Sequence, residues 1–323
     1  MKKISLTIED MFNIPTAEIF NAGVYKPVTS VSIDSRNISR NAMFVAIKGK
    51  KLDGHKFIKD AVKNGAKAIV INKNRVKNYE DTGIPVIAVK NTTVALGSIA
   101  KKWREKLQTK IIGITGSAGK TSTKEMLALL LSEKYNVNKT IANNNNHIGV
   151  PLTLFSTNNR HDILVAELGT NHFGEIDYTA NITQPDYALI TNIGDSHLEY
   201  LNNRQGVLKE KLALFEAVAL KNGTLFINND DKLLKKVLKN YQNKVTYGFD
   251  FSSDVQGKIT SYTEDGKAKI EIKYKDKTLR ETVPLYGEQN AKNFLASAAV
   301  AFKLGMTSSQ ISNGIKRLSA VEK

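Results

Sequence analysis

A glycine-rich stretch between an apolar run and a helical segment is the part of this chain best suited to chemistry. It consists of Gly116, Ser117, Ala118, Gly119, Lys120 and Thr121. In such a loop the glycines let backbone N–H groups face an anion, and the dipole of the following helix attracts negative charge. Lys120 would contact the outer phosphates of a nucleotide, and the Thr121 hydroxyl would coordinate Mg²⁺. Ile114 stands where the longer form of this loop has its first glycine, so the sequence predicts the short form. The Lys120–Thr121 pair and the flanking apolar and helical segments favour a phosphate-binding loop over a plain glycine-rich turn.

An acidic residue at the end of another apolar run supplies a candidate metal ligand. Glu167 follows residues 163–166, which read Ile-Leu-Val-Ala and predict a buried strand. Ligands of open α/β sheets bind at the carboxyl ends of the strands, and a carboxylate placed there holds Mg²⁺ in phosphate-loop enzymes. The alternative is an acid that only marks the strand end. The phosphate loop upstream favours the metal site.

Four further polar residues are ambiguous from their local sequence. His197 follows an apolar strand and is typical of a hydrogen-bonded structural histidine. Lys211 lies in a helical stretch, where a lysine usually covers the surface. Asn290 and Asn293 stand one helical turn apart, where their amides could cap a helix or contact a base. No Ser-His-Asp arrangement, carboxylate pair or metal-spaced histidine cluster stands out, so positioning and electrostatics are expected to carry the chemistry.

The elements that must position these residues alternate between strands and helices. Strands of a small first unit are predicted at 44–47, 68–71 and 86–89, with a helix over 57–64. Strands of a second unit are predicted at 111–115, 163–168, 187–193 and 224–227, with helices over 121–134, 174–182 and 204–220. This α/β alternation predicts a doubly wound, mostly parallel sheet with helices on both faces.

The domain boundaries follow from what surrounds these series. A helix over 92–107 leads directly into the strand of the phosphate loop, so we place the first boundary near residue 90. Residues 244–284 alternate between polar and apolar side chains, which predicts an antiparallel hairpin region appended to the sheet. A helix over 291–304 follows. The predicted domains are 1–90 and 91–323.

Composition bounds the class of protein. The chain has 323 residues, no cysteine and a formal net charge of +16. The lack of cysteine excludes disulfides and thiolate metal sites and is compatible with the cytoplasm. The chain carries no apolar run of about eighteen residues, so we expect no membrane insertion. The basic residues are mostly scattered lysines without interleaved aromatics, and 232–244 reads as a surface helix, so we expect no nucleic-acid interface.

Taken in order, the motifs resemble those of the Mur ligase family of ATP-dependent amide ligases. The stretches that carry the resemblance are 32–36 (Ser-Ile-Asp-Ser-Arg) with 53–55 (Asp-Gly-His), the phosphate loop 115–121, 145–152 (Asn-Asn-His-Ile-Gly-Val-Pro-Leu), 167–176 (Glu-Leu-Gly-Thr-Asn-His-Phe-Gly-Glu-Ile) and 287–293 (Gly-Glu-Gln-Asn-Ala-Lys-Asn). The stretches 145–152 and 167–176 are specific to one branch, whereas the phosphate loop is shared with folylpolyglutamate synthetases. The resemblance covers nearly the whole chain.

The resemblance implies a nucleotide and metal site. The phosphate loop would bind ATP, with Asn290 and Asn293 near the adenine. Gln289 stands where many family members have histidine. Thr121 and Glu167 would hold one Mg²⁺, and His197 would help Lys211 to hold a second. Lys211 matches a carbamylated lysine in the pattern Lys-x-x-Leu-Phe, which reverses its interpretation as a surface residue, because a carbamate is a hard oxygen ligand.

The resemblance also implies a substrate and a reaction. Lys120, Lys211 and His197 would be catalytic, and Ser35, Arg36, Asn145 and Asn146 would contact the substrate. The implied protein is a cytoplasmic monomer in which a UDP-binding first domain and an ATP-binding second domain serve peptidoglycan precursor synthesis. The implied reaction joins D-alanyl-D-alanine to UDP-N-acetylmuramoyl-tripeptide and is driven by ATP.

The end of the chain and two alternatives qualify this expectation. Family members continue into a third, Rossmann-like domain that receives the amine substrate, and the chain is expected to lack it, since it stops at residue 323. Weak or no activity is therefore expected of these two domains alone. The alternatives are a folylpolyglutamate-type ligase, which the motif at 32–36 argues against, and a basic nucleotide- or nucleic-acid-binding module.

Overall fold

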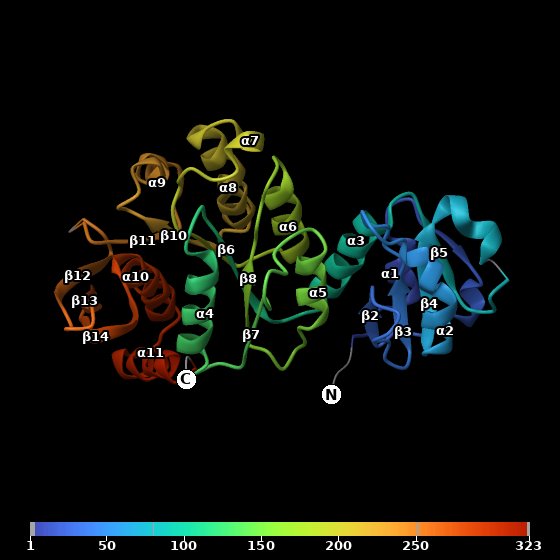
Figure 1. Ribbon diagram of the computed structural model, residues 1–323, viewed down its shortest axis with the longest axis horizontal. Coiled ribbons are helices and arrows are strands. Elements are labelled where there is room, and N and C mark those ends of the chain that lie inside the picture. Colours follow the sequence, from blue (N-terminus) through green and yellow to red (C-terminus); the bar gives the residue numbers. More distant parts are fainter. Residues whose placement is uncertain (1–3, 80, 251, 322–323) are drawn as a thin grey trace. The chain divides into compact units, whose positions relative to one another are not determined.

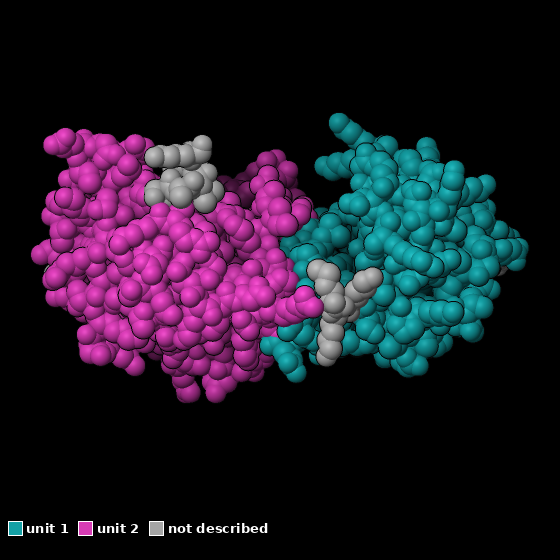
Figure 2. All heavy atoms as spheres, turned by 90° about the horizontal axis from the view of Figure 1, so that it is seen from below, with its two compact units in different colours: residues 1–108, 147–159 teal, residues 109–146, 160–323 magenta. Residues whose placement is uncertain are grey.

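The chain divides into two compact units. The computed structural model describes residues 4–321, apart from residues 80 and 251. Unit 1 comprises residues 1–108 and 147–159, and unit 2 comprises residues 109–146 and 160–323 (Figure 2). Each unit is built around its own sheet. Within the described residues, no helix combines the length and the apolar character needed to cross a membrane.

The sheet of unit 1 has five strands in the order β1-β5-β4-β3-β2 (Figure 1). They are β1 (Glu18–Phe20), β2 (Ser30–Ser32), β3 (Ala42–Val45), β4 (Ala66–Asn72) and β5 (Val86–Val89). β1 pairs with β5 in antiparallel fashion, and the other pairings are parallel. The three strands predicted here are confirmed as β3, β4 and β5. β1 and β2 were missed because three residues carry too little apolar pattern to be recognised.

Helices cover both faces of this sheet. One face packs against α1 (Ile8–Phe12), α3 (Thr92–Arg104) and α5 (Gly149–Phe155), and the other packs against α2 (Ile58–Lys63). The side chains of β4 alternate between them, since Ala68 and Val70 belong to the first core and Ile69 and Ile71 to the second. Because both faces are buried, these strands read as continuous apolar runs in the sequence.

Helix α3 belongs to unit 1, so the units divide at residue 108 and not at the expected residue 90. Leu96, Ile99 and Trp103 of α3 are buried in the core of unit 1. Trp103 Nε1 donates a hydrogen bond to Thr157 O at 3.0 Å, and this bond connects α3 to the segment 147–159, which contains α5. The sequence grouped α3 with the phosphate loop because the two are neighbours along the chain, but packing of the apolar face of α3 decides its place.

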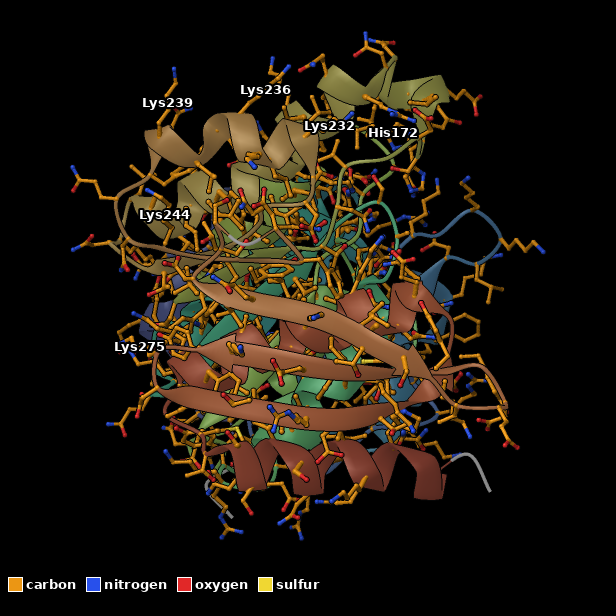
Figure 3. The ribbon with its side chains drawn as sticks, turned by 90° about the vertical axis from the view of Figure 1, so that its left-hand side faces the viewer. His172, Lys232, Lys236, Lys239, Lys244 and Lys275 are labelled. Carbon is orange, nitrogen blue, oxygen red and sulfur yellow. The ribbon has the colours of Figure 1, made fainter. Side chains whose placement is uncertain are left out.

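The sheet of unit 2 has nine strands in the order β14-β13-β12-β11-β10-β9-β6-β8-β7 (Figure 1). The parallel strands are β6 (Lys110–Thr115), β7 (Val137–Lys139), β8 (Ile163–Glu167), β9 (Tyr187–Ile190), β10 (Thr224–Asn228) and β11 (Lys244–Gly248). The antiparallel extension consists of β12 (Val255–Tyr262), β13 (Lys267–Tyr274) and β14 (Lys277–Tyr286), seen face-on in Figure 3. The predicted parallel sheet with an appended antiparallel region is confirmed.

The helices of unit 2 lie on opposite faces of its parallel strands. On one side α10 (Glu288–Lys303) and α11 (Ser308–Val321) pack against α4 (Lys120–Leu131), and on the other α6 (Glu175–Thr183) packs against α8 (Arg204–Ala219). Strand β6 separates the two layers. Ile112 and Ile114 share a core with α4, whereas a Cβ on Gly113 would lie 2.8 Å from Leu214 Cδ1 of α8. Gly113 therefore lets α8 approach the sheet closely.

The parallel pairing brings four polar chain segments to one edge of this sheet. The phosphate loop follows β6, and the segment from Glu167 onward ends β8. Residues 191–197 follow β9 and lead into the short helix α7 (Leu198–Leu201), and residues 228–231 lead from β10 into α9 (Lys232–Val237). The carboxyl ends of parallel strands form the edge at which open α/β sheets bind ligands.

Candidate nucleotide and metal site

The phosphate loop takes a backbone shape that only glycine accommodates at two positions. Gly116 has φ +152° and Gly119 has φ +79°, and both angles disfavour other residues. A Cβ on Gly116 would lie 1.9 Å from Thr191 Oγ1, and one on Gly119 would lie 2.5 Å from Asn293 Oδ1. The loop is therefore pressed between the segment after β9 and helix α10. The predicted strand, loop and helix are all present, so the structure has the context that a phosphate site requires.

Asn192, which the sequence did not single out, shapes the loop. Ser117 N donates to Asn192 O and Ala118 N to Asn192 Oδ1, both at 3.0 Å. Asn192 Nδ2 donates in return to Ala118 O at 3.1 Å. The N–H groups of Ser117 and Ala118 are thus occupied by Asn192, whereas the first bond of α4 runs from Thr123 N to Gly119 O. The start of α4, whose first N–H groups have no partner within the helix, is left to face an anion.

Lys120 is folded back over the loop. Its Nζ donates to Gly116 O at 2.8 Å. Burial lowers the pKa of Lys120, and attraction by Glu167 partly offsets that effect. A lysine held at a helix start by one carbonyl can exchange that contact for a phosphate oxygen without a change of backbone. This geometry suits the phosphate contact that the sequence predicts.

Glu167 and Thr121 meet as a metal site requires. Glu167 is 1% exposed, and Thr121 Oγ1 donates to its two carboxylate oxygens at 3.2 and 3.0 Å. Asn145 Nδ2 donates to Oε1 at 2.9 Å, and Glu167 N donates to Thr140 Oγ1 at 3.0 Å. A hydroxyl and an oriented carboxylate are the hard oxygen ligands that Mg²⁺ prefers, so these residues fit that ion. Among the described residues, no three histidine or acidic side chains are arranged so that they could hold a metal ion by themselves, so further ligands of this ion would come from phosphate and water.

Asn145 and Asn146 have different environments. Gly169 N donates to Asn145 O at 2.8 Å, and a Cβ on Gly169 would lie 2.8 Å from the Asn145 side chain. Asn145 is thus fixed beside Glu167, and its amide orients that carboxylate. Asn146 is exposed, and a substrate contact there remains a prediction.

Lys211 is buried, contrary to what its helix pattern indicated. It lies on α8 with 1% of its surface exposed. Burial and, to a smaller extent, repulsion by Lys120 lower the pKa of Lys211 to about 7, although Glu210 opposes the shift. An amine with such a pKa is largely neutral near pH 8, which is the form that reacts with CO₂ to give a carbamate. The environment therefore suits the carbamylated lysine that the family resemblance implies.

His197 precedes α7 as its N-cap and lies within electrostatic reach of this lysine. Its backbone is left-handed, with φ +52° and ψ +34°. Burial lowers the pKa of His197, and repulsion by Lys211 and Lys120 lowers it further. A neutral imidazole is the form that binds a metal. The structure thus brings His197, Lys211 and Lys120 within electrostatic reach of one another, as the predicted site needs.

A cavity of about 210 Å³ adjoins the phosphate loop on the side of α10. Its lining residues are Thr191, Asn192, Asn228, Asp230, Asp231, Tyr247, Gln289, Lys292, Asn293 and Ala296. Asn293 is 3% exposed and Gln289 Nε2 donates to its Oδ1 at 3.2 Å, so one of the two residues predicted near the adenine lines this cavity. Asn290 lies outside the lining, and its Nδ2 donates to the carbonyl of Tyr286, the last residue of β14, at 2.9 Å.

The sequence missed the acidic residues of this cavity. Asp231 caps α9 by accepting from Leu233 N and Leu234 N, and it also accepts from Ile193 N at 2.7 Å. Asp230 accepts from Phe249 N and Asp250 N. Both follow β10, so polar residues directly after a predicted strand were the signal that could have revealed them.

A second polar cavity, of about 300 Å³, lies within unit 1. Its lining residues are Lys48, Asp53, His55, Asn72, Asn74, Arg75, Lys90, Asn91, Thr92 and Thr93, which follow the carboxyl ends of β3, β4 and β5. His55 Nδ1 lies 2.7 Å from Asp53 Oδ1, and Asn72 N donates to His55 Nε2 at 3.0 Å. Asp53 also pairs with Arg75 at 3.4 Å.

The predicted substrate residues Ser35 and Arg36 lie outside that lining. They follow β2 at the same edge of the sheet. Ser35 is buried, and its carbonyl accepts from Asn64 Nδ2 at 2.9 Å. Arg36 is exposed and forms two hydrogen bonds with the Asp34 carboxylate, which hold the pKa of Asp34 at about 2. Their contact with a substrate remains a prediction.

A glycine loop at a helix start, with a buried carboxylate and a hydroxyl beside it on a doubly wound sheet, defines a nucleotide-binding protein of the phosphate-loop class. Two models of one family match most of the chain. The Mur ligase family catalytic domain matches residues 27–104, and the Mur ligase middle domain matches residues 114–301. The chain belongs to the Mur ligase family.

Curated proteins of similar sequence belong to one branch of the Mur ligase family. The UDP-N-acetylmuramoyl-tripeptide–D-alanyl-D-alanine ligase of Haemophilus influenzae is 36% identical over 299 residues, which cover 91% of this chain and 64% of that protein. The ligase of the same name from Escherichia coli K12 is 32% identical over 321 residues, with coverage of 98% and 69%. The chain therefore spans about two thirds of the length of these curated relatives.

Two solved structures of MurF ligases have a similar fold. MurF from Acinetobacter baumannii superimposes with a TM-score of 0.85 at 29% identity, over 98% of this chain and 68% of that one. MurF ligase from Thermotoga maritima in complex with ADP superimposes with a TM-score of 0.77 at 29% identity, over 88% and 65%. A folylpolyglutamate synthetase complex shares the fold alone, at 15% identity and a TM-score of 0.55 over 69% and 65%.

Proposed function

We propose that this chain forms the nucleotide- and UDP-sugar-binding part of an ATP-dependent ligase that joins D-alanyl-D-alanine to UDP-N-acetylmuramoyl-tripeptide. The observation that carries the proposal is the meeting of three groups at one sheet edge. These are the phosphate loop with Lys120, the Thr121–Glu167 pair and the buried Lys211, which is within electrostatic reach of Lys120. The names of the relatives supply the substrates.

The reaction class requires charge stabilisation more than a protein nucleophile. The terminal carboxylate of the tripeptide attacks the γ-phosphorus of ATP, and ADP leaves. The amine of D-alanyl-D-alanine then attacks the acyl carbon, loses a proton, and inorganic phosphate leaves as the amide forms. Both steps bring anions together or spread negative charge over oxygen atoms, which fixed cations stabilise.

The residues of the chain divide this work. The N-terminus of α4 and Lys120 would bind the outer phosphates, and Thr121 and Glu167 would hold Mg²⁺. When bound, Mg²⁺ neutralises phosphate charge as a Lewis acid. The cavity beside Asn293 would receive the nucleoside end. Lys211, as its carbamate, and His197 would hold a second Mg²⁺ near the acyl group.

The cavity of unit 1 suits the uridine nucleotide. Lys48, Arg75 and Lys90 supply positive charge, and Asn72 and Asn91 supply amides at the edge of the sheet where ligands bind. Ser35 and Arg36 would extend this surface from β2. We also propose a cytoplasmic, monomeric protein, because ATP and nucleotide-sugar substrates are cytoplasmic compounds and each unit has its own complete core.

Isothermal titration calorimetry with four ligands tests the proposal. We expect the chain to bind UDP-N-acetylmuramoyl-tripeptide and, with Mg²⁺, ADP, and to bind neither folate nor duplex DNA at 0.15 M salt. That salt concentration suppresses unspecific attraction of DNA to a basic protein. Binding of folate without the UDP-sugar peptide would support a folylpolyglutamate-type enzyme, and binding of DNA alone would support a nucleic-acid-binding module. Either result would overturn the proposal.

A further inference from the structure

A buried lysine beside the metal site has no part in the function described so far. Lys124 lies on α4, one turn after Lys120, and 0% of its surface is exposed. Its Nζ is 3.1 Å from Glu125 Oε1 and 3.6 Å from Glu167 Oε2. The same nitrogen makes no well-aligned hydrogen bond within the described residues. A long charged side chain is seldom buried completely unless its charge is needed there.

The two neighbouring carboxylates differ in their need for this charge. Glu125 is 37% exposed at its side chain and also pairs with Lys139. Glu167 is 2% exposed at its side chain, and Lys124 is the only lysine or arginine within 4 Å of it among the described residues. Its hydrogen-bond donors Thr121 and Asn145 are neutral. A buried carboxylate without a cation is strongly destabilising, so Glu167 depends on Lys124 more than Glu125 does.

We propose that Lys124 is a positioning residue that acts as the internal counter-charge of Glu167. It holds the carboxylate in place from the protein side when no metal is bound. Its charge also competes with Mg²⁺ for the same carboxylate. Lys124 therefore lowers the affinity of the site for the metal–nucleotide product and promotes release of that product. The inference rests on the proposed function, since it takes Glu167 as a ligand of nucleotide-bound Mg²⁺.

The direction in which removal of Lys124 changes the affinity for the metal–nucleotide follows from the charges. Without Lys124, the buried Glu167 of the metal-free protein has no lysine or arginine within 4 Å among the described residues and keeps only the longer-range attraction of Lys120, whereas Mg²⁺ supplies a close positive charge in the nucleotide complex. Removing Lys124 must therefore destabilise the free protein more than the complex. By linkage, the variant then binds the metal–nucleotide more tightly than the wild type.

A cycle of thermal unfolding measurements on the metal-free chain tests the pairing. We expect Lys124→Met to lower the unfolding midpoint by about 6 °C or more, and to cost much less in a Glu167→Gln background. In a Glu125→Gln background the full cost should remain. Lys139→Met is the matched control, because it removes a cation from Glu125 without touching Glu167. A cost that disappears in the Glu125→Gln background and persists in the Glu167→Gln background would overturn the proposal.

Calorimetric titration with ADP and Mg²⁺ tests the competition. We expect Lys124→Met to bind Mg²⁺·ADP about tenfold more tightly than the wild type, with Lys139→Met unchanged. Equal or weaker binding by Lys124→Met would contradict the role in release. If Lys124→Met does not fold, Lys124→Met/Glu167→Gln should fold, and failure of that variant too would show a packing role and overturn the proposal. The unfolding cycle needs no nucleotide, so its result for Lys124 does not depend on whether the proposed function holds.

Discussion

Burial gives identical side chains different chemistry at the site. Lys209 and Lys211 are two residues apart on α8, yet Lys209 is exposed and Lys211 is 1% exposed. Lys209 keeps its contact with water, whereas burial favours the neutral amine of Lys211. Since the neutral amine is the form that a carbamate requires, the position of one lysine beneath the site decides whether that chemistry is available.

The pKa of Lys211 predicts a pH-dependent stability. Its folded value is about 7, below the ordinary value of about 10.4. Between these values the unfolded chain binds a proton that the folded chain does not, so the free energy of unfolding rises with pH. Lys211→Met should therefore be more stable than the wild type at pH 6, and this advantage should shrink by about 1.4 kcal/mol per pH unit above pH 7.

Urea unfolding from pH 6 to 10 in CO₂-free buffer measures this effect. Lys209→Met is the control, and its difference from the wild type should not vary over the same range. Parallel pH profiles for Lys211→Met and the wild type would show that Lys211 stays protonated, and would remove the basis for a carbamate at this position.

The sequence could predict some of these residues and not others for a physical reason. The phosphate loop and Glu167 are recognisable because their signal is local, namely glycines and an acid next to apolar strands. Lys211 and Lys124 look like surface lysines, because their burial comes from chain segments far away in the sequence. Only the family resemblance identified Lys211, and nothing in the local pattern identified Lys124 or Asn192.

At the scale of elements, one carboxylate connects two helices at the site. Glu210 of α8 is 4% exposed and accepts hydrogen bonds from Gly174 N at 2.7 Å and Ile176 N at 2.8 Å. It also accepts from Thr170 Oγ1 at 3.1 Å. These donors start α6 and belong to the loop that follows Glu167, and a negative charge at a helix N-terminus is favourable. Glu210 thereby fixes α8, and with it Lys211, against the loop that follows Glu167.

Glu210→Gln should destabilise the chain by about 2 kcal/mol. The amide nitrogen of glutamine cannot accept from backbone N–H groups, so at least one buried donor loses its partner, and the charge at the start of α6 is lost. Urea unfolding at pH 7.5 measures the change. Glu216→Gln, at an exposed position of the same helix, should change the free energy of unfolding by less than about 0.5 kcal/mol. Equal effects of the two substitutions would refute the capping role.

Elements were predictable in proportion to their length and periodicity. Strands β3 to β6 and β8 to β10 carry continuous apolar runs, and helices α3, α4, α6, α8 and α10 have clear periodicity; all were predicted within a few residues. The strand β7 has three residues of intermediate burial, and α7 has four residues, so neither carries a detectable pattern. The surface helix predicted over 232–244 is shorter, with α9 ending at Val237, although Lys232, Lys236 and Lys239 do face solvent (Figure 3).

At the scale of the whole molecule, each unit places polar side chains at the carboxyl edge of its own parallel strands. In unit 1 this edge carries the cavity with Lys48 and Arg75, and in unit 2 it carries the phosphate loop. The division at residue 108 could not be predicted, because the segment 147–159 returns to unit 1 after the phosphate loop and no local signal marks that return. Two edges with separate cores predict two binding sites that can be lost separately.

Separate loss of the two sites is the prediction for the intact chain. Lys120→Ala should weaken binding of Mg²⁺·ADP at least about tenfold, because it removes the phosphate contact of the loop, and should leave binding of UDP-N-acetylmuramoyl-tripeptide unchanged. Lys48→Ala/Arg75→Ala should do the reverse, because it removes two cations from the cavity of unit 1. Lys77→Ala, an exposed position outside that cavity, is the control.

Calorimetric titrations of each variant with both ligands measure the outcome, and circular dichroism confirms folding. Equal loss of both ligands in a folded Lys120→Ala variant would contradict two independent sites, and unchanged Mg²⁺·ADP binding would remove Lys120 from the phosphate site.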